Sequence, residues 1–71
     1  MPRKLRQLKA DLRKAGFVER PGKGSHTNWT HALVPIGVTL SGHDGDEAKP
    51  YQERDVREAL RTLREAQGKQ P

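Results

Sequence analysis

Apolar residues near the start of the chain recur with the spacing of a helix. Leu5, Leu8, Leu12 and Ala15 are three or four positions apart, and Arg and Lys residues fill the opposite face. Gly16 is expected to end this helix, because glycine readily adopts the left-handed conformation that helix C-caps favour. The pattern therefore predicts an amphipathic helix whose apolar face packs on a core.

The next part of the chain alternates apolar and polar residues, which is typical of short strands. A first strand is predicted over residues 17–20 and stops at the Pro-Gly pair 21–22. A second strand is predicted from about residue 26 to residue 34, and residues 35–37, Pro-Ile-Gly, are expected to form a turn. A third strand follows over residues 38–41. We therefore expect three strands joined by turns.

Successive side chains of a strand point to opposite faces of the sheet, so the sequence predicts on which face each ring of the second strand lies. His26 shares one face with Asn28, whereas Trp29 and His31 lie on the other. Trp29 could stack on a base, but the sole tryptophan of so small a domain more often anchors the core, and we expect it there. His31 is interpreted as a packed or surface-bonded histidine more readily than as an RNA contact.

A second helical stripe follows a loop of turn-forming residues, 42–50. This stripe has i, i+3, i+4, i+7 spacing and consists of Val56, Ala59, Leu60 and Leu63. The predicted fold is α+β, in the order α-β-β-β-α, with a three-stranded antiparallel sheet that carries both helices on one face. We expect one domain over residues 1–66 and a frayed tail over residues 67–71.

Composition narrows the class of protein. A chain of 71 residues without cysteine has room for one domain and no disulfide or thiolate metal site. No apolar run approaches the roughly 20 residues that cross a bilayer, so we expect no membrane association and a cytoplasmic location. The net charge of +5 resides in residues 1–20, and such a concentration attracts a phosphate backbone or an acidic protein surface. The candidate phosphate contacts on the first helix are Arg6, Lys9 and Arg13.

The most informative candidate site is the glycine-rich, basic turn that ends at His26. An imidazole can accept the proton of a ribose 2′-hydroxyl or protonate a leaving 5′-oxygen without a metal. Lys23 and the backbone N–H groups of residues 22–25, that of Gly24 included, could hold the scissile phosphate, and Ser25 could orient the phosphate or the ring. Considered alone, however, a lone histidine at the start of a strand is more often structural.

A second polar cluster lies in the loop before the last helix. His43, Asp44, Asp46 and Glu47 are possible metal ligands, but they lack the ligand spacing of an EF-hand and a defined histidine pair. A solvated turn is the simpler interpretation. We assign neither a metal nor a cofactor to the chain.

Several of these motifs together resemble the HicA-type mRNA interferase toxins, over most of the chain. The resemblance rests on Gly16-Phe17 after the first helix, Gly24-Ser25-His26 followed by Trp29 and His31, Val38-Thr39-Leu40, and Lys49-Pro50 before the helix containing Val56-Arg57-Glu58-Ala59-Leu60. It implies a fold like that of double-stranded-RNA-binding domains and an endoribonuclease whose single catalytic histidine is His26. It also implies a HicB-type antitoxin, expected to be acidic, that covers the site. We expect a monomeric free toxin and a hetero-oligomer with the antitoxin. The family often has a second histidine where this chain has Thr27.

Three classes of function therefore remain open. The first is a metal-independent endoribonuclease toxin that acts on mRNA, and the second is an RNA-binding module without catalytic activity. The third is a protein-interaction module. Glu53 and Asp55 lie at the start of the second helix, where double-stranded-RNA-binding domains usually clamp phosphates with basic residues. This difference favours the nuclease over a passive duplex binder.

Overall fold

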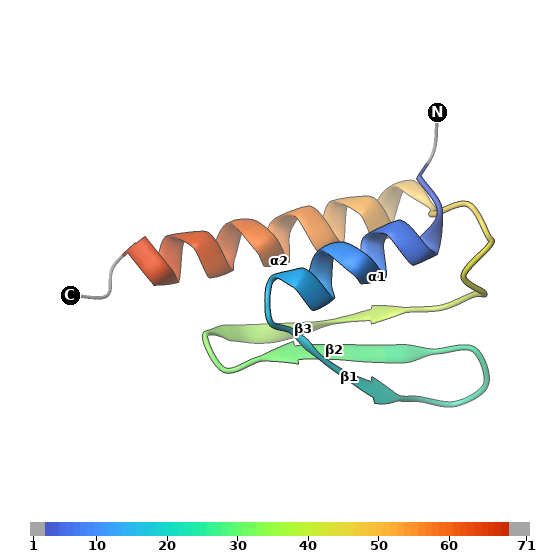
Figure 1. Cartoon of the computed structure of the whole chain (residues 1–71), viewed down its shortest axis with the longest axis horizontal. Coiled ribbons are helices and arrows are strands. Elements are labelled where there is room, and N and C mark those ends of the chain that lie inside the picture. Colours follow the sequence, from blue (N-terminus) through green and yellow to red (C-terminus); the bar gives the residue numbers. More distant parts are fainter. Residues whose placement is uncertain (1–2, 69–71) are drawn as a thin grey trace.

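The computed structural model describes residues 3–68 and contains two helices and three strands. The elements in chain order are α1 (Leu5–Lys14), β1 (Val18–Pro21), β2 (Thr27–His31), β3 (Val34–Leu40) and α2 (Pro50–Gly68) (Figure 1). Both neighbouring strand pairs are antiparallel, and the strand order in the sheet is β1-β2-β3. The predicted α+β class and the order α-β-β-β-α are confirmed.

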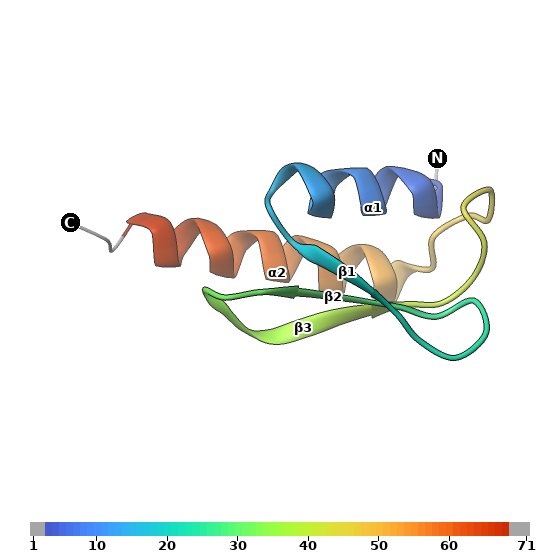
Figure 2. The same ribbon diagram turned by 60° about the horizontal axis from the view of Figure 1, so that its bottom comes forward.

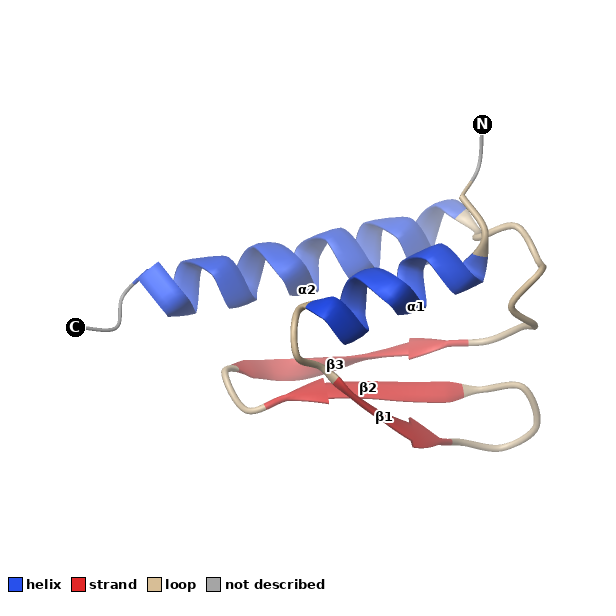
Figure 3. Ribbon diagram, in the orientation of Figure 1, coloured by secondary structure: helices blue, strands red, loops and turns tan. Residues whose placement is uncertain are grey.

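The molecule has two layers, with both helices on the same face of the sheet (Figures 1 and 2). The opposite face carries exposed polar side chains, among them Asn28, Thr30 and Thr39. Figure 3, in the orientation of Figure 1, shows that α2 extends well past the end of α1. Among residues 3–68, no helix is long and apolar enough to cross a membrane.

The core lies between the two layers and contains the apolar stripes of both helices. Its buried members are Leu5, Leu8, Leu12, Phe17, Trp29, Val34, Val38, Leu40, Ala48, Val56, Ala59 and Leu63. Trp29 is completely buried, and its indole N–H donates to Thr27 Oγ1 at 2.9 Å. A buried indole N–H needs such a partner, because desolvating it without one is costly. The prediction of Trp29 as a core residue is confirmed.

The boundary between the second and third strands differs from the prediction. The turn lies at residues 32–33, and the Pro-Ile-Gly segment expected to form it lies inside β3. His31 closes the actual turn, because its Nδ1 accepts the Leu33 N–H at 3.0 Å. Pro35 is tolerated because β3 is an edge strand, where a missing N–H need not break a ladder. Val34 consequently begins β3 and is buried in the core, whereas alternation along the predicted strand of residues 26–34 places it on the face of His26 and Asn28.

A bulge explains why β3 contains a glycine. The register between β2 and β3 shifts between Trp29 and His31. A Cβ on Gly37 would lie 2.8 Å from the Trp29 carbonyl oxygen, closer than side chains are found to approach backbone. Gly37 therefore permits the close contact of the two strands at the bulge.

Helix α2 begins at Pro50, where proline's fixed φ and missing N–H suit a first helical turn. Its predicted stripe faces the core, although Leu60 is only partly buried. Gln52 is also buried: its side-chain amide donates to the Ser41 carbonyl at 3.0 Å and accepts the Lys49 N–H at 2.8 Å. The helix continues through residues 67–68, where the sequence predicts a frayed tail, and residues 69–71 lie outside the described part of the chain.

Candidate functional site

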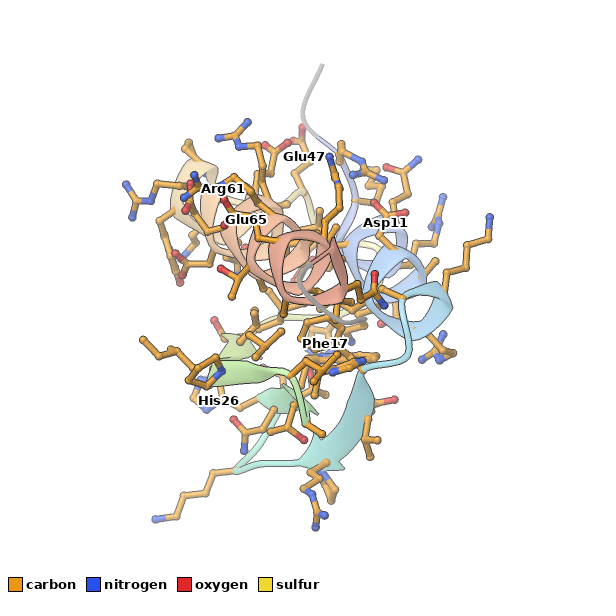
Figure 4. All side chains as sticks on the ribbon, turned by 90° about the vertical axis from the view of Figure 1, so that its left-hand side faces the viewer. Asp11, Phe17, His26, Glu47, Arg61 and Glu65 are labelled. Carbon is orange, nitrogen blue, oxygen red and sulfur yellow. The ribbon has the colours of Figure 1, made fainter. Side chains whose placement is uncertain are left out.

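The loop between β1 and β2 is closed by its own backbone. The Gly22 N–H donates to the His26 carbonyl at 2.9 Å, and the His26 N–H donates to the Lys23 carbonyl at 3.0 Å. Gly24 has a φ of +58°, in the left-handed region that glycine adopts without strain. The loop therefore holds the His26 backbone immediately before β2 while the side chain stays exposed. Figure 4 shows His26 on the sheet side of the molecule, and Phe17 between the sheet and the helices.

One hydrogen bond joins this loop to the segment that follows β3. The Gly42 N–H donates to Ser25 Oγ at 3.1 Å. Gly42 has a φ of +115°, and a Cβ there would lie 2.8 Å from Leu5 Cδ1. Only glycine fits this crossing without displacing its neighbours. The two loops thus meet beside the N-terminal half of α1.

The loops and α1 enclose an open pocket of about 550 Å³. The residues that line it come from α1, β1, β2 and the two loops: Lys9, Glu19, Pro21, Gly22, Gly24, Ser25, His26, Thr27, Gly42, His43 and Asp44. Of the predicted site residues, the pocket brings together Lys9, Gly24, Ser25 and His26. Lys23 is exposed, and neither it nor Arg6 nor Arg13 contributes to the lining.

The basic flank of α1 borders this pocket but is partly neutralised. Lys9 Nζ lies 2.6 Å from Asp44 Oδ1, and only 12% of the Lys9 side chain is exposed. The hydrogen bond from Lys9 lowers the pKa of Asp44, with further contributions from the charges of Lys9, Arg13 and Arg6. Arg13 pairs with Glu19 at 3.3 Å and lies 5.4 Å from the centre of the Trp29 ring. Two of the three predicted phosphate contacts on α1 therefore have acidic partners within the chain.

His31 is a packed residue. It is half-buried, its ring centre is 5.3 Å from that of Phe17, and its Nδ1 accepts the Leu33 N–H. These contacts agree with the structural interpretation of His31 over a role in binding RNA.

His43 and Asp44 line the pocket, and sequence reasoning placed them only in a solvated turn. The His43 N–H donates to Asp46 Oδ2 at 2.9 Å, and the Asp46 N–H returns to the His43 carbonyl at 2.9 Å, so the loop is indeed a tight turn. Its position beside His26 depends on the length of β3 and on the Ser25–Gly42 contact, which no local motif encodes. Within residues 3–68, no group of three or more histidine and carboxylate side chains is arranged to hold a metal ion.

The structure is thus a small α+β domain with an exposed histidine in a glycine-rich loop beside a basic helix. The family model for the HicA toxin of bacterial toxin–antitoxin systems matches residues 5–67. The chain belongs to this family, as its sequence motifs suggested, and it is therefore a toxin of a toxin–antitoxin system whose partner is an antitoxin. Comparison with curated proteins and with solved structures found no significant match.

Proposed function

We propose that this toxin is an endoribonuclease that cleaves mRNA without a metal ion, and that His26 is its acid-base group. The observation that carries the proposal is the position of His26, which is exposed, held by a hydrogen-bonded loop and directed to the border of an open pocket. Imidazole is the side chain best suited to accept and return a proton near neutral pH. Within residues 3–68 the His26 ring forms no hydrogen bond, so it is free to do so.

In the proposed reaction, His26 accepts the proton of a ribose 2′-hydroxyl, whose oxygen attacks the adjacent phosphorus. The bond from phosphorus to the 5′-oxygen breaks, which leaves a 2′,3′-cyclic phosphate and a 5′-hydroxyl. This route requires positioning and charge stabilisation at the phosphate and no metal. The products are diagnostic, because hydrolysis by a metal-bound water leaves a linear phosphate monoester instead.

The phosphate would bind where the β1–β2 loop meets α1. The Gly22 N–H is used within the loop, so the N–H groups available among the predicted ones are those of Lys23, Gly24 and Ser25, which have no backbone partner within residues 3–68. Successive N–H groups in a glycine-rich turn form a concavity that favours anions. The Lys23 ammonium and the nearby flank of α1 add positive charge.

The antitoxin is proposed to be an acidic HicB-type protein that covers His26. Charge complementarity supports this, since the positive charge of the chain is concentrated in the segment that includes α1 and β1. The free toxin would be a monomer and the silenced form a hetero-oligomer. Action on mRNA would place both in the cytoplasm.

The test is to incubate the purified protein with a long RNA in the presence of a chelator. Cleavage supports the nuclease, retarded migration without cleavage would identify a non-catalytic RNA-binding module, and no effect would favour a protein-interaction module. The His26→Ala variant is expected to cleave about a hundredfold to ten-thousandfold more slowly. Its free energy of unfolding should change by only about 0.5 kcal/mol, as is typical of exposed positions.

Thr30→Ala is the matched control, because Thr30 is exposed on β2 but outside the pocket. We expect it to cleave at the parent rate. If His26→Ala cleaves as fast as Thr30→Ala, or if it unfolds the domain, His26 is not the acid-base group.

A further inference from the structure

His43 shares the pocket with His26 and has no part in the reaction described so far. We infer that His43 is a second catalytic residue, the general acid that protonates the 5′-oxygen as it leaves. The inference rests on the proposed nuclease function and completes its proton transfers. From the sequence alone, His43 is interpreted as part of a solvated turn.

The two histidines are brought together by the hydrogen bond between their loops. Ser25 and Gly42 are the residues directly before His26 and His43, and Ser25 Oγ accepts the Gly42 N–H at 3.1 Å. The histidines therefore follow a fixed junction between two segments that are far apart in the sequence. Both side chains are exposed and both line the same pocket.

The backbone around His43 is held on both sides. The turn with Asp46 fixes His43 itself, through the two hydrogen bonds between these residues. Asp44 is anchored to α1 twice, because its carbonyl accepts the Arg6 N–H at 3.1 Å and its carboxylate binds Lys9. A proton donor gains most when its backbone is already positioned and its ring is free to meet the substrate.

The other charged side chains that line the pocket are already paired. Lys9 and Asp44 bind each other, and Glu19 binds Arg13. Asp46, outside the lining, accepts the His43 N–H through its carboxylate. Within residues 3–68, the two histidines are thus the acid-base side chains of this pocket that form no ion pair.

The chemistry requires two proton transfers at separate places. The attacking 2′-oxygen and the leaving 5′-oxygen lie on opposite sides of the phosphorus when displacement is in line. His26 takes the 2′-hydroxyl proton as the new phosphorus–oxygen bond forms, and the His43 imidazolium gives its proton to the 5′-oxygen as the old bond breaks. The products are a 2′,3′-cyclic phosphate, a 5′-hydroxyl, protonated His26 and neutral His43, and exchange with water restores both rings.

The test compares two RNA oligonucleotides that contain a mapped cleavage site. In one, the leaving atom is the normal 5′-oxygen, and in the other it is a bridging sulfur, which leaves as a thiolate and needs no proton. His43→Ala is expected to slow cleavage of the oxygen substrate about a hundredfold or more and to cleave the sulfur substrate at close to the parent rate. His26→Ala should slow both, because the attacking hydroxyl is the same.

His43→Asn is a second variant that keeps a polar side chain in the turn and should behave as His43→Ala does. Glu47→Gln is the matched control, because Glu47 is exposed in the same loop and does not line the pocket. Parent-like cleavage of the oxygen substrate by both His43 variants would overturn the inference and leave the proposed function intact. Equal slowing of both substrates, or rescue by sulfur in His26→Ala instead, would also overturn it. If the parent protein cleaves neither RNA, the proposed function itself fails.

Discussion

His26 directly precedes β2 and His31 is its last residue, and the two histidines differ in what holds their rings. The His31 ring contacts Phe17 and accepts a backbone hydrogen bond, and its Nε2 would lie 3.5 Å from a Cβ placed on Gly16. The His26 ring faces solvent at the border of the pocket. The same side chain is therefore structural at one position and free for the proposed proton transfer at the other.

This contrast predicts opposite phenotypes for the two alanine variants. His31→Ala leaves the half-buried Leu33 N–H without its acceptor and removes the contact with Phe17, so we expect a loss of about 1–2 kcal/mol in the free energy of unfolding. That loss lowers the melting temperature by about 4–8 °C per kcal/mol in a domain of this size. Thermal unfolding followed by circular dichroism measures it. Cleavage assayed well below the transition should remain close to the parent rate, and a loss of cleavage at unchanged stability would contradict this assignment.

At the scale of elements, the helices were more predictable than the strands. The stripe of Leu5, Leu8 and Leu12 needs only the helical period to be recognised, and the structure buries all three. The boundary between β2 and β3 depends instead on tertiary context. Pro35 and Gly37 are typical of turns, but an edge position accepts the proline and the bulge at Trp29 requires the glycine.

The candidate site also contains residues that the sequence predicts and residues that only the folded chain brings together. Gly24, Ser25 and His26 are adjacent in the sequence, so their shared turn could be predicted from local signals. The partner of Lys9 is Asp44, which lies far along the chain, and His43 reaches the pocket only because β3 returns the chain to that edge. Such contacts follow from the packed fold, which spacing alone does not encode.

The junction between the two loops can be tested through Ser25. Ser25→Ala removes the acceptor of the Gly42 N–H but leaves the backbone bonds that close the β1–β2 loop. We expect cleavage to slow about ten- to a hundredfold, because small displacements of reacting groups have effects of this size. The free energy of unfolding should fall by about 1 kcal/mol or less, since the bond is exposed.

Ser41→Ala is the matched control for this substitution. Ser41 directly follows β3, and its contact with Gln52 uses the backbone carbonyl, which the substitution keeps. We expect cleavage at the parent rate. Equal activity of the Ser25→Ala and Ser41→Ala variants would show that the hydrogen bond between the loops does not position the reacting groups.

At the scale of the whole molecule, the net charge overstates the positive charge available for the proposed binding of RNA. Residues 1–20 carry the entire excess of +5, but Arg3, Lys9 and Arg13 form ion pairs with Asp11, Asp44 and Glu19. Arg6 forms no ion pair within residues 3–68. A phosphate backbone must therefore compete with internal carboxylates for Lys9 and Arg13, whereas Arg6 is immediately available.

This distribution predicts how RNA binding depends on salt. Each phosphate contact with a single strand contributes about 0.7 to the slope of log affinity against log salt concentration. Replacing Arg6, Lys9 and Arg13 with glutamine should weaken binding to different RNAs alike and flatten the slope, with an upper limit of about 2 for three contacts. Because Lys9 and Arg13 already form ion pairs within the chain, we expect the slope to change by less than that limit. Of the three single substitutions, Arg6→Gln should change the slope most. Fluorescence anisotropy over a salt series gives the slopes, measured in a His26→Ala background so that the RNA is not cleaved.

The control replaces Arg54, Arg57 and Arg61 of α2 with glutamine, which makes the same change in net charge away from the pocket. If that control flattens the slope equally, RNA responds to net charge alone, and a loss confined to one RNA sequence would show that α1 reads bases.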